Sequence, residues 1–423
     1  MRIILFACTI IFLFASCRQQ ITADMIVHGA KIYTADSSFS VVEAMAIKDG
    51  KILETGTTAD ILNTYTAPEK VNAEGKIIYP GFIDGHAHFY GYALSLQKVN
   101  LVGTKSWDDC INQIQQFVKD KQISRGEWIL GYGWDQNDWD NKVFPSKTLL
   151  DQYFPENPVY LSRVDGHAAI VNQAALDRAG IKAGDKVAGG IIETKAGKLT
   201  GVLVDNAMGR VGNIIPEPDD KTLKELFDEA QKKCFAVGLT SITDCGLSKR
   251  ETERLDALQK EGILKMKLTV LLSDDSANYA WYLPRGIYKT ERLHISGFKL
   301  FADGALGSRG ACLLKPYNDK PGWYGFLLND INHYTSALSK IYQSPFQACV
   351  HAIGDSANRV ILQQFAALLT PGNDRRWRIE HAQVVAPEDV KLFGKFNIIP
   401  SVQPTHATSD MYWAEDRLGA GRI

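Results

Sequence analysis

Two histidines one residue apart end an apolar segment near the start of the chain. Residues 81–88 read GFIDGHAH, and the run over 77–83 that leads into them has the composition of a short buried strand. In an extended chain, side chains two positions apart project from the same face. His86 and His88 can therefore offer two imidazoles to one cation, although His-x-His pairs also arise by chance on polar loops.

Two further histidines stand at the ends of later apolar segments. Residues 346–351 (FQACVH) end in His351, and residues 377–381 (WRIEH) end in His381. A single histidine at a strand end is more often structural than a ligand. Two of them in successive strand–helix units, both downstream of a His-x-His pair, favour one shared metal site, because imidazoles on one rim converge on one axis.

Lys299 lies inside an otherwise apolar segment, residues 295–304 (ISGFKLFADG). An unpaired ammonium in such a segment is costly. Three interpretations remain open from the residues alone. Lys299 forms a buried ion pair, for example with Asp303, or its side chain reaches out to water, or carbon dioxide carboxylates it to an anion that can bridge two cations.

The composition of the whole chain is that of an ordinary globular protein. It has 423 residues, of which 45% are hydrophobic and 22% charged, so there is enough material for a large core. The formal net charge of −1 gives no indication of a nucleic-acid partner.

The first 17 residues differ from the rest. An arginine at position 2, an apolar run of about a dozen residues and the small residues before Cys17 have the layout of a secretory signal peptide, too short for a membrane span. The sequence FASC at 14–17 resembles a bacterial lipoprotein cleavage box, apart from Phe14. We therefore expect lipidation at Cys17 and an exported protein, periplasmic or on the outer face, that touches the membrane only through this anchor. An ordinary signal peptide with an incidental cysteine is the alternative.

Five cysteines follow Cys17, and they indicate neither disulfides nor a zinc knuckle, because their number is odd and no C-x-x-C spacing occurs. The residues that follow the signal segment, 18–76, have the character of β-strands, with a two-residue hairpin turn at Asp49 and Gly50. From residue 77 strands alternate with helical patterns, which favours parallel strand–helix units. We predict a TIM-like (β/α)8 barrel over 77–423, with an open doubly wound sheet as the alternative. The predicted strands are 77–83, 128–132, 158–163, 239–243, 266–272, 295–301, 346–351, 376–380 and 397–402.

The order of these candidate ligands resembles that of the amidohydrolase superfamily. Four further motifs narrow the resemblance to amidohydrolase family 3 and its N-substituted formamide deformylases: GYGWD at 131–135, DGHAAIVN at 165–172, KLFADGALGSR at 299–309 and HAIGD at 351–355. The likeness runs from about residue 24 to the end of the chain.

The resemblance implies a barrel of the metal-dependent hydrolase type and a small β-sandwich domain, to which residues 18–76 contribute the N-terminal part. It implies one or two divalent ions, with zinc the first candidate and iron, manganese or nickel the others. Their ligands would be His86, His88, Lys299 as a carbamate, His351 and His381. The implied reaction is hydrolysis of a non-peptide C–N bond, of amide or formamide type, in a small molecule by a metal-activated hydroxide.

Two residues are candidates for substrate binding, largely on the same resemblance. His167 follows a turn after a predicted strand, and Trp134 stands next to Asp135 in the GYGWD motif. For Trp134, packing in the core is an equal alternative. Arg309 could bind a carboxylate or anchor its loop, and we favour the anchor. A homodimer is compatible with the sequence, although no surface feature argues for it.

One departure from the family pattern concerns catalysis. The family places an aspartate at the end of strand eight, in a Gly-Ser-Asp context, and no Gly-Ser-Asp occurs here. Asp410 and Asp416 stand in predicted loop or helix, so neither takes this role. We therefore expect a barrel without strand eight, truncated at its C-terminus, that binds metal with little turnover. The alternatives are a non-catalytic lipoprotein that binds metal or a ligand, and a mononuclear hydrolase in which Lys299 stays an ammonium.

Overall fold

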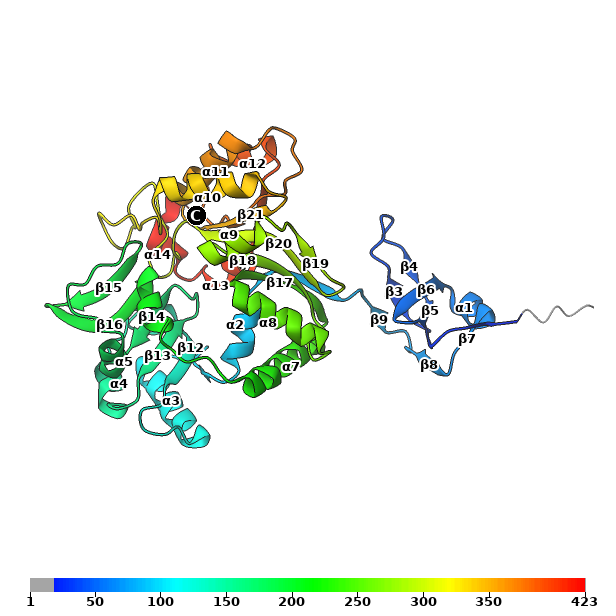
Figure 1. Cartoon of the computed structure of the whole chain (residues 1–423), viewed down its shortest axis with the longest axis horizontal. Coiled ribbons are helices and arrows are strands. Elements are labelled where there is room, and N and C mark those ends of the chain that lie inside the picture. The colour runs from blue at the N-terminus through cyan, green and yellow to red at the C-terminus, as the bar shows by residue number, and fades with distance from the viewer. Residues whose placement is uncertain (1–18, 423) are drawn as a thin grey trace, which may run out of the picture. The chain divides into compact units, whose positions relative to one another are not determined.

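The computed structural model describes residues 19–422, and the chain divides into two compact units between Phe82 and Ile83 (Figure 1). The signal segment and Cys17 lie outside the described residues, so their assignment stays a prediction. No helix within residues 19–422 has the length and apolarity needed to cross a lipid bilayer.

The first unit is a set of small sheets with one helix, α1 (Thr58–Thr64). A four-stranded sheet has the order β6-β5-β2-β8, a three-stranded sheet the order β4-β3-β9, and β1 pairs with β7. The strands are β1 (Ile21–Thr22), β2 (Met25–His28), β3 (Lys31–Tyr33), β4 (Val41–Val42), β5 (Ala44–Lys48), β6 (Lys51–Gly56), β7 (Tyr65–Thr66), β8 (Glu69–Asn72) and β9 (Ile77–Ile78).

The predicted hairpin at Asp49 and Gly50 is confirmed. Strands β5 and β6 pair antiparallel with Lys48 opposite Lys51, and both turn residues have positive φ angles, 51° and 70°. Two successive positive φ angles are the geometry of a type I′ turn, which Asp-Gly favours because glycine adopts it without strain.

The second unit is built on seven barrel strands in the order β10-β17-β18-β20-β21-β22-β23. Each neighbouring pair from β17 to β23 is parallel, which confirms the predicted fold class. Strands β10 and β23 are the two ends of this order, and no eighth barrel strand follows among the described residues. The bounds are β10 (Phe82–Ala87), β17 (Leu239–Leu247), β18 (Lys267–Ser273), β20 (Leu293–Phe301), β21 (Gln347–Ala352), β22 (Arg378–His381) and β23 (Ile399–Ser401). The short β19 (Tyr288–Lys289) pairs antiparallel with β20.

A six-stranded sheet is inserted between β10 and β17, and it corrects two of the strand predictions. The segments 128–132 and 158–163 form strands as expected, but in this sheet rather than in the barrel. Its order is β11-β12-β13-β14-β16-β15, with antiparallel pairs from β13 onward. We call these strands and their helices the insert: β11 (Val99–Asn100), β12 (Ile129–Trp134), β13 (Val159–Arg163), β14 (Ala168–Val171), β15 (Gly190–Lys195), β16 (Lys198–Asp205), α3 (Trp107–Lys121), α4 (Thr148–Tyr153) and α5 (Gln173–Arg178).

The segment 77–83 is not the single buried strand that its composition predicts. Pro80 and Gly81 interrupt it, so β9 ends at Ile78 and β10 begins at Phe82. Proline and glycine are the residues that most often break a strand. His86 consequently lies within β10, and His88 follows its end.

Each part of the second unit has its own apolar core, and Figure 1 shows the two groups of strands apart. The barrel core lies between the strands and their helices, with Trp377, Phe298 and Phe365 among its fully buried side chains. Helices α7 (Asp220–Ala236), α8 (Lys249–Lys260), α10 (Ile331–Tyr342) and α11 (Asp355–Leu368) supply its outer layer. The insert has a separate core that includes Trp134 and Trp139.

Candidate metal centre and active site

The side chains predicted as metal ligands all line one cavity of about 610 Å³. They come from the carboxyl ends of four barrel strands, where the loops of such barrels build their sites. The insert contributes His167 to the same cavity. The residues concerned are His86, His88, His167, Lys299, His351 and His381.

The histidine rings form a continuous chain across this cavity. Ring centroids are 5.7 Å apart for His86 and His88, 4.7 Å for His86 and His381, and 4.6 Å for His381 and His351. His167 extends the chain, with its ring centroid 4.9 Å from that of His351. The prediction that these histidines share one mouth of the barrel thus agrees with their positions.

His86 is oriented by a buried carboxylate. Its Nδ1–H donates to Oε2 of Glu380 over 2.6 Å, and the Glu380 side chain is fully buried. Burial opposes ionisation of Glu380, but the hydrogen bond from His86 and the charge of Arg378 outweigh it and lower the pKa to about 2. The Nε2 atom of His86 is buried and has no hydrogen-bond partner among the described residues. This nitrogen is therefore free to bind a cation.

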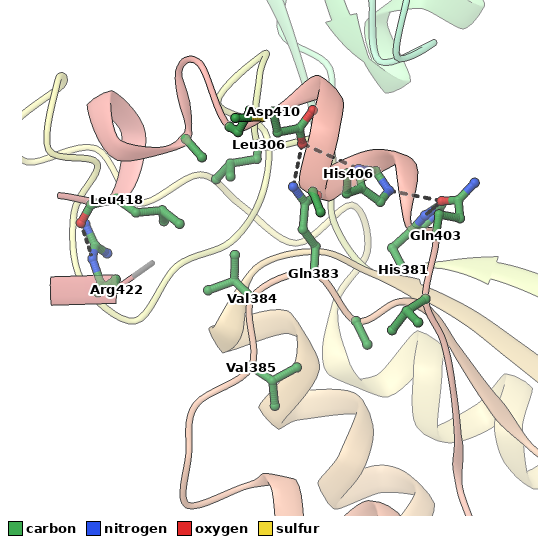
Figure 2. Close-up of a pocket in the computed structure, with 15 residues that line it drawn as sticks. Leu306, His381, Gln383, Val384, Val385, Gln403, His406, Asp410, Leu418 and Arg422 are labelled. Carbon is green, nitrogen blue, oxygen red and sulfur yellow. Dashed lines mark hydrogen bonds and ion pairs between the residues drawn. The ribbon is translucent and has the colours of Figure 1, made fainter. Parts of the chain in front are cut away.

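His381 is held in a comparable way by an amide. Its Nδ1–H donates to Oε1 of Gln403 over 2.5 Å, and the same oxygen accepts a bond from His406 at 3.0 Å. Figure 2 shows Gln403 next to both rings, and Asp410 bonded to Gln383 and close to His406. His406 belongs to α13 (Thr405–Ser409), so the last part of the described chain supports this candidate ligand. A neighbouring cavity of about 550 Å³ shares these residues.

Lys299 is a buried amine whose Nζ lies 4.5 Å from the ring centroid of Phe301 and has no hydrogen-bond partner among the described residues. Its residue is 1% exposed. Asp303, the partner considered from the sequence, accepts instead from the backbone N–H groups of Ile353, Gly354 and Cys312. The structure thus does not support a Lys299–Asp303 ion pair. Burial lowers the pKa of Lys299, which favours the neutral amine.

Burial also favours the neutral form of the His381 and His351 imidazoles. Burial lowers the pKa of His381 to about 2, with contributions from Lys299 and His86, and it lowers the pKa of His351 well below the usual range. A neutral imidazole is the form that binds a metal ion.

These residues fit a divalent metal ion by two observations. The unpartnered Nε2 of His86 and the unpartnered Nζ of Lys299 are buried polar atoms, which native proteins rarely leave unsatisfied. Within residues 19–422, no three or more His, Cys, Asp and Glu side chains are drawn together as tightly as a bound ion requires. Lys299 is not one of those residue types. It lines the same cavity as the imidazoles.

His167 is fixed by a second buried carboxylate, Asp205. Its Nδ1–H donates to Oδ1 of Asp205 over 2.7 Å, and the backbone N–H of Asp205 donates to the carbonyl of His167. A Cβ atom at either Gly304 or Gly310 would lie 2.4 Å from Oδ2 of Asp205. These two glycines of the KLFADGALGSRG segment therefore make room for this carboxylate, and His167 stays a candidate for substrate contact.

Two other predictions are resolved differently. Trp134 is fully buried in the core of the insert, and its indole N–H donates to the carbonyl of Leu161 over 2.9 Å. This placement supports the packing alternative and gives no support for contact with a substrate. Arg309 pairs with Asp319 at 2.8 Å, so it anchors its loop as favoured.

Three supporting residues were missed in the sequence: Glu380, Asp205 and Gln403. Glu380 carries one mark, since it is a charged residue within a predicted strand, but nothing in the local sequence pairs it with His86. Asp205 and Gln403 carry no such mark. Arg163, also missed, is buried at the rim, where it pairs with Asp135 and Asp165 and donates to Gln136.

Comparison with known proteins assigns the chain to a family. The model of the amidohydrolase family matches residues 69–423. Protein LONG AFTER FAR-RED 3 of Arabidopsis thaliana is 34% identical over 95% of this chain and 71% of its own length. The N-substituted formamide deformylase of Arthrobacter pascens is 26% identical over 85% of this chain and 69% of its own length.

A solved structure shows the same architecture. An uncharacterized metal-dependent hydrolase from Pyrococcus furiosus superposes with a TM-score of 0.69 at 27% identity, over 94% of this chain and 80% of the other. The family match and this solved structure support a metal-dependent hydrolase and imply a divalent metal ion. The chain belongs to the amidohydrolase family.

Proposed function

We propose that this protein hydrolyses a non-peptide C–N bond, of amide or formamide type, in a small molecule. The carrying observation is the pair of buried atoms without hydrogen-bond partners, His86 Nε2 and Lys299 Nζ, among imidazoles at one end of the barrel. The bond type rests on the resemblance to relatives that include an N-substituted formamide deformylase.

We further propose that His86, His88, Lys299, His351 and His381 hold one or two divalent ions, zinc being the first candidate. A bound divalent ion polarises a carbonyl oxygen and lowers the pKa of water toward neutrality. Lys299 would serve as a carbamate, because only a neutral amine reacts with carbon dioxide and burial lowers the pKa of this amine, which favours its neutral form. Without the carbamate, Lys299 would supply no negative charge to the cations.

The insert would provide the substrate side of the cavity. His167 presents its ring to the cavity while Asp205 occupies its Nδ1 atom, so Nε2 is left to contact a polar group of the substrate. Arg163 is not available to a substrate, because Asp135, Asp165 and Gln136 occupy its guanidinium. Its role in this proposal is to hold the rim in shape.

The described residues offer little support for one step of the proposed reaction, the transfer of a proton to the leaving nitrogen. The departing nitrogen needs a proton, and general acid–base groups contribute about 10²–10⁴ in rate. Asp410 lines the cavity, but it is engaged by Gln383 and His406. No strand-eight carboxylate occurs within residues 19–422, so we propose slow turnover by residues 18–423.

The alternative function is binding without catalysis, as in a ligand-binding lipoprotein. Metal analysis of purified residues 18–423 separates the candidates. Two equivalents of metal support the bridged site, one equivalent supports a mononuclear site with Lys299 as an ammonium, and none contradicts the metal-dependent hydrolase.

A substrate screen tests the reaction itself. Purified protein loaded with zinc in bicarbonate buffer is offered N-substituted formamides, N-acyl amines, dipeptides and esters, with H86A/H88A protein as the control. We expect release of amine from formamides or simple amides, slowly, and none from the control. Hydrolysis confined to dipeptides or esters would contradict the proposed bond type.

Export and lipid anchoring through Cys17 remain part of the proposal. Expression of the full chain in a bacterium with labelled palmitate should label the protein and place it in the membrane fraction, whereas Cys17→Ser should remove both the label and this location. An unlabelled wild-type protein would contradict the anchor.

A further inference from the structure

The interior of the barrel holds a polar group that the proposed chemistry does not use. Glu380 and Arg378 both lie on β22, two positions apart, and so share the inward face. The Nε–H of Arg378 donates to Oε1 of Glu380 over 2.7 Å, while Oε2 of Glu380 accepts from Nδ1 of His86. Each oxygen of this fully buried carboxylate thus has a cationic or polar partner.

The contact joins His86 to a strand that β10 does not pair with. Strand β10 is an end strand, and β17 is its only neighbour in the barrel order given by residues 19–422. The bond from Glu380 on β22 supports the ring from across the barrel, and Arg378 also brings a guanidinium nitrogen to 3.5 Å from the carbonyl of Gly85.

The contact also fixes which nitrogen of His86 carries the proton. A carboxylate only accepts hydrogen bonds, so Nδ1 of His86 must carry the hydrogen, and the lone pair lies on Nε2. That atom is the one left buried without a partner. Carboxylates that orient metal-binding imidazoles in this manner typically contribute 10- to 100-fold in metal affinity.

We infer that Glu380, which is itself bonded to Arg378, is the positioning residue of this metal centre. It holds His86 with Nε2 directed at the cation and fixes the tautomer of His86. The inference rests on the proposed function, since it requires a metal ion at His86. It adds a residue on β22, the sixth barrel strand. This residue acts on the ligand His86 and does not bind the ion itself.

The test compares zinc affinity in matched variants by competition with a chelating indicator. Glu380→Gln keeps the size of the side chain but turns one acceptor oxygen into a donor, and we expect zinc to bind 10- to 100-fold more weakly. The control is Asp274→Asn. Asp274 accepts from His333 at the same 2.6 Å, but neither residue lines the cavity, and we expect less than a twofold change.

A double variant shows whether Glu380 acts through His86. In a His86→Ala background, Glu380→Gln should cause no further loss of zinc affinity. An equal loss in both backgrounds would overturn the inference, as would unchanged affinity in the single variant. If the wild-type protein binds no zinc, the proposed function fails as well, which distinguishes that outcome from failure of the inference alone.

A spectroscopic measurement covers the case in which Glu380→Gln does not fold. Imidazole ¹H–¹⁵N spectra of the wild-type protein, with the His86 signals assigned by their loss in His86→Ala, report the tautomer directly. We expect the proton on Nδ1 in both the zinc-free and the zinc-loaded protein. A proton on Nε2 would overturn the inference.

Discussion

The barrel and the insert both bring a buried carboxylate to a histidine of the same cavity, but they do so in different surroundings. In the barrel, Glu380 holds His86 beside Lys299 and three more imidazoles. In the insert, Asp205 holds His167 at the edge of that row, on a sheet whose own core is apolar. The difference suggests a division of labour, in which the barrel binds the metal and the insert shapes the side that meets the substrate.

The largest expected effect is a loss of stability in the insert, and it tests whether Trp134 serves packing or catalysis. Trp134→Ala should destabilise the protein by about 3–5 kcal/mol, because it empties a fully buried site. Zinc affinity of the folded protein should change less than twofold. Urea unfolding and zinc titration measure the two effects, with Trp134→Phe as the milder variant. A variant of normal stability that has lost activity would indicate that Trp134 contacts the substrate.

The second prediction concerns the amine at the centre of the barrel site. Lys299→Met should weaken zinc binding by more than about 100-fold, since it removes a proposed ligand rather than a supporting residue. Unfolding should require the same or up to about 1 kcal/mol more free energy, because an unpartnered buried polar group is replaced by an apolar chain. Loss of stability with unchanged zinc binding would mean that Lys299 is a structural residue.

The third prediction asks whether the two carboxylate–histidine pairs differ in function. Asp205→Asn should lower kcat/KM about 10- to 100-fold, on whichever amide the wild-type protein hydrolyses, because it removes a hydrogen bond to a charged group worth about 1.5–3 kcal/mol. Zinc affinity should stay within twofold. If Asp205→Asn weakens zinc binding as much as Glu380→Gln does, His167 is a metal ligand and the division between barrel and insert is wrong.

The smallest effect should be the same in both regions. Ser106 caps α3 of the insert and Ser248 caps α8 of the barrel, each by accepting a backbone N–H three residues on. Either serine changed to alanine should cost about 1 kcal/mol of unfolding free energy. Thermal melts compare the two variants. A cost confined to one of them would show that the regions do not unfold as one cooperative unit.

Much of the barrel could be predicted from the sequence, because each strand is a short apolar run that ends at a polar residue. Strands β17, β18, β20, β21, β22 and β23 all lie where such runs predict them. The runs at 128–132 and 158–163 look the same, yet they form the insert. Their sheet is decided by pairing of β12 with β11 and of β13 with β14, which the local sequence does not reveal.

The site divides in the same manner. The strand-end histidines and Lys299 could be recognised from residue type and spacing alone. Their supporting partners could not, because Glu380 is 294 positions from His86 and Asp205 is 38 positions from His167. Trp134 was ambiguous because aromatic residues serve both cores and binding sites, and only its burial distinguishes the two.

The central claim is that side chains from four barrel strands bind divalent metal together. Anomalous diffraction at the zinc edge, from crystals of the zinc-loaded protein, tests it most directly. The account predicts one or two peaks about 2.0–2.1 Å from His86 Nε2 and its neighbouring imidazoles. Zinc bound elsewhere, with His86 and Lys299 still unpartnered, would contradict it.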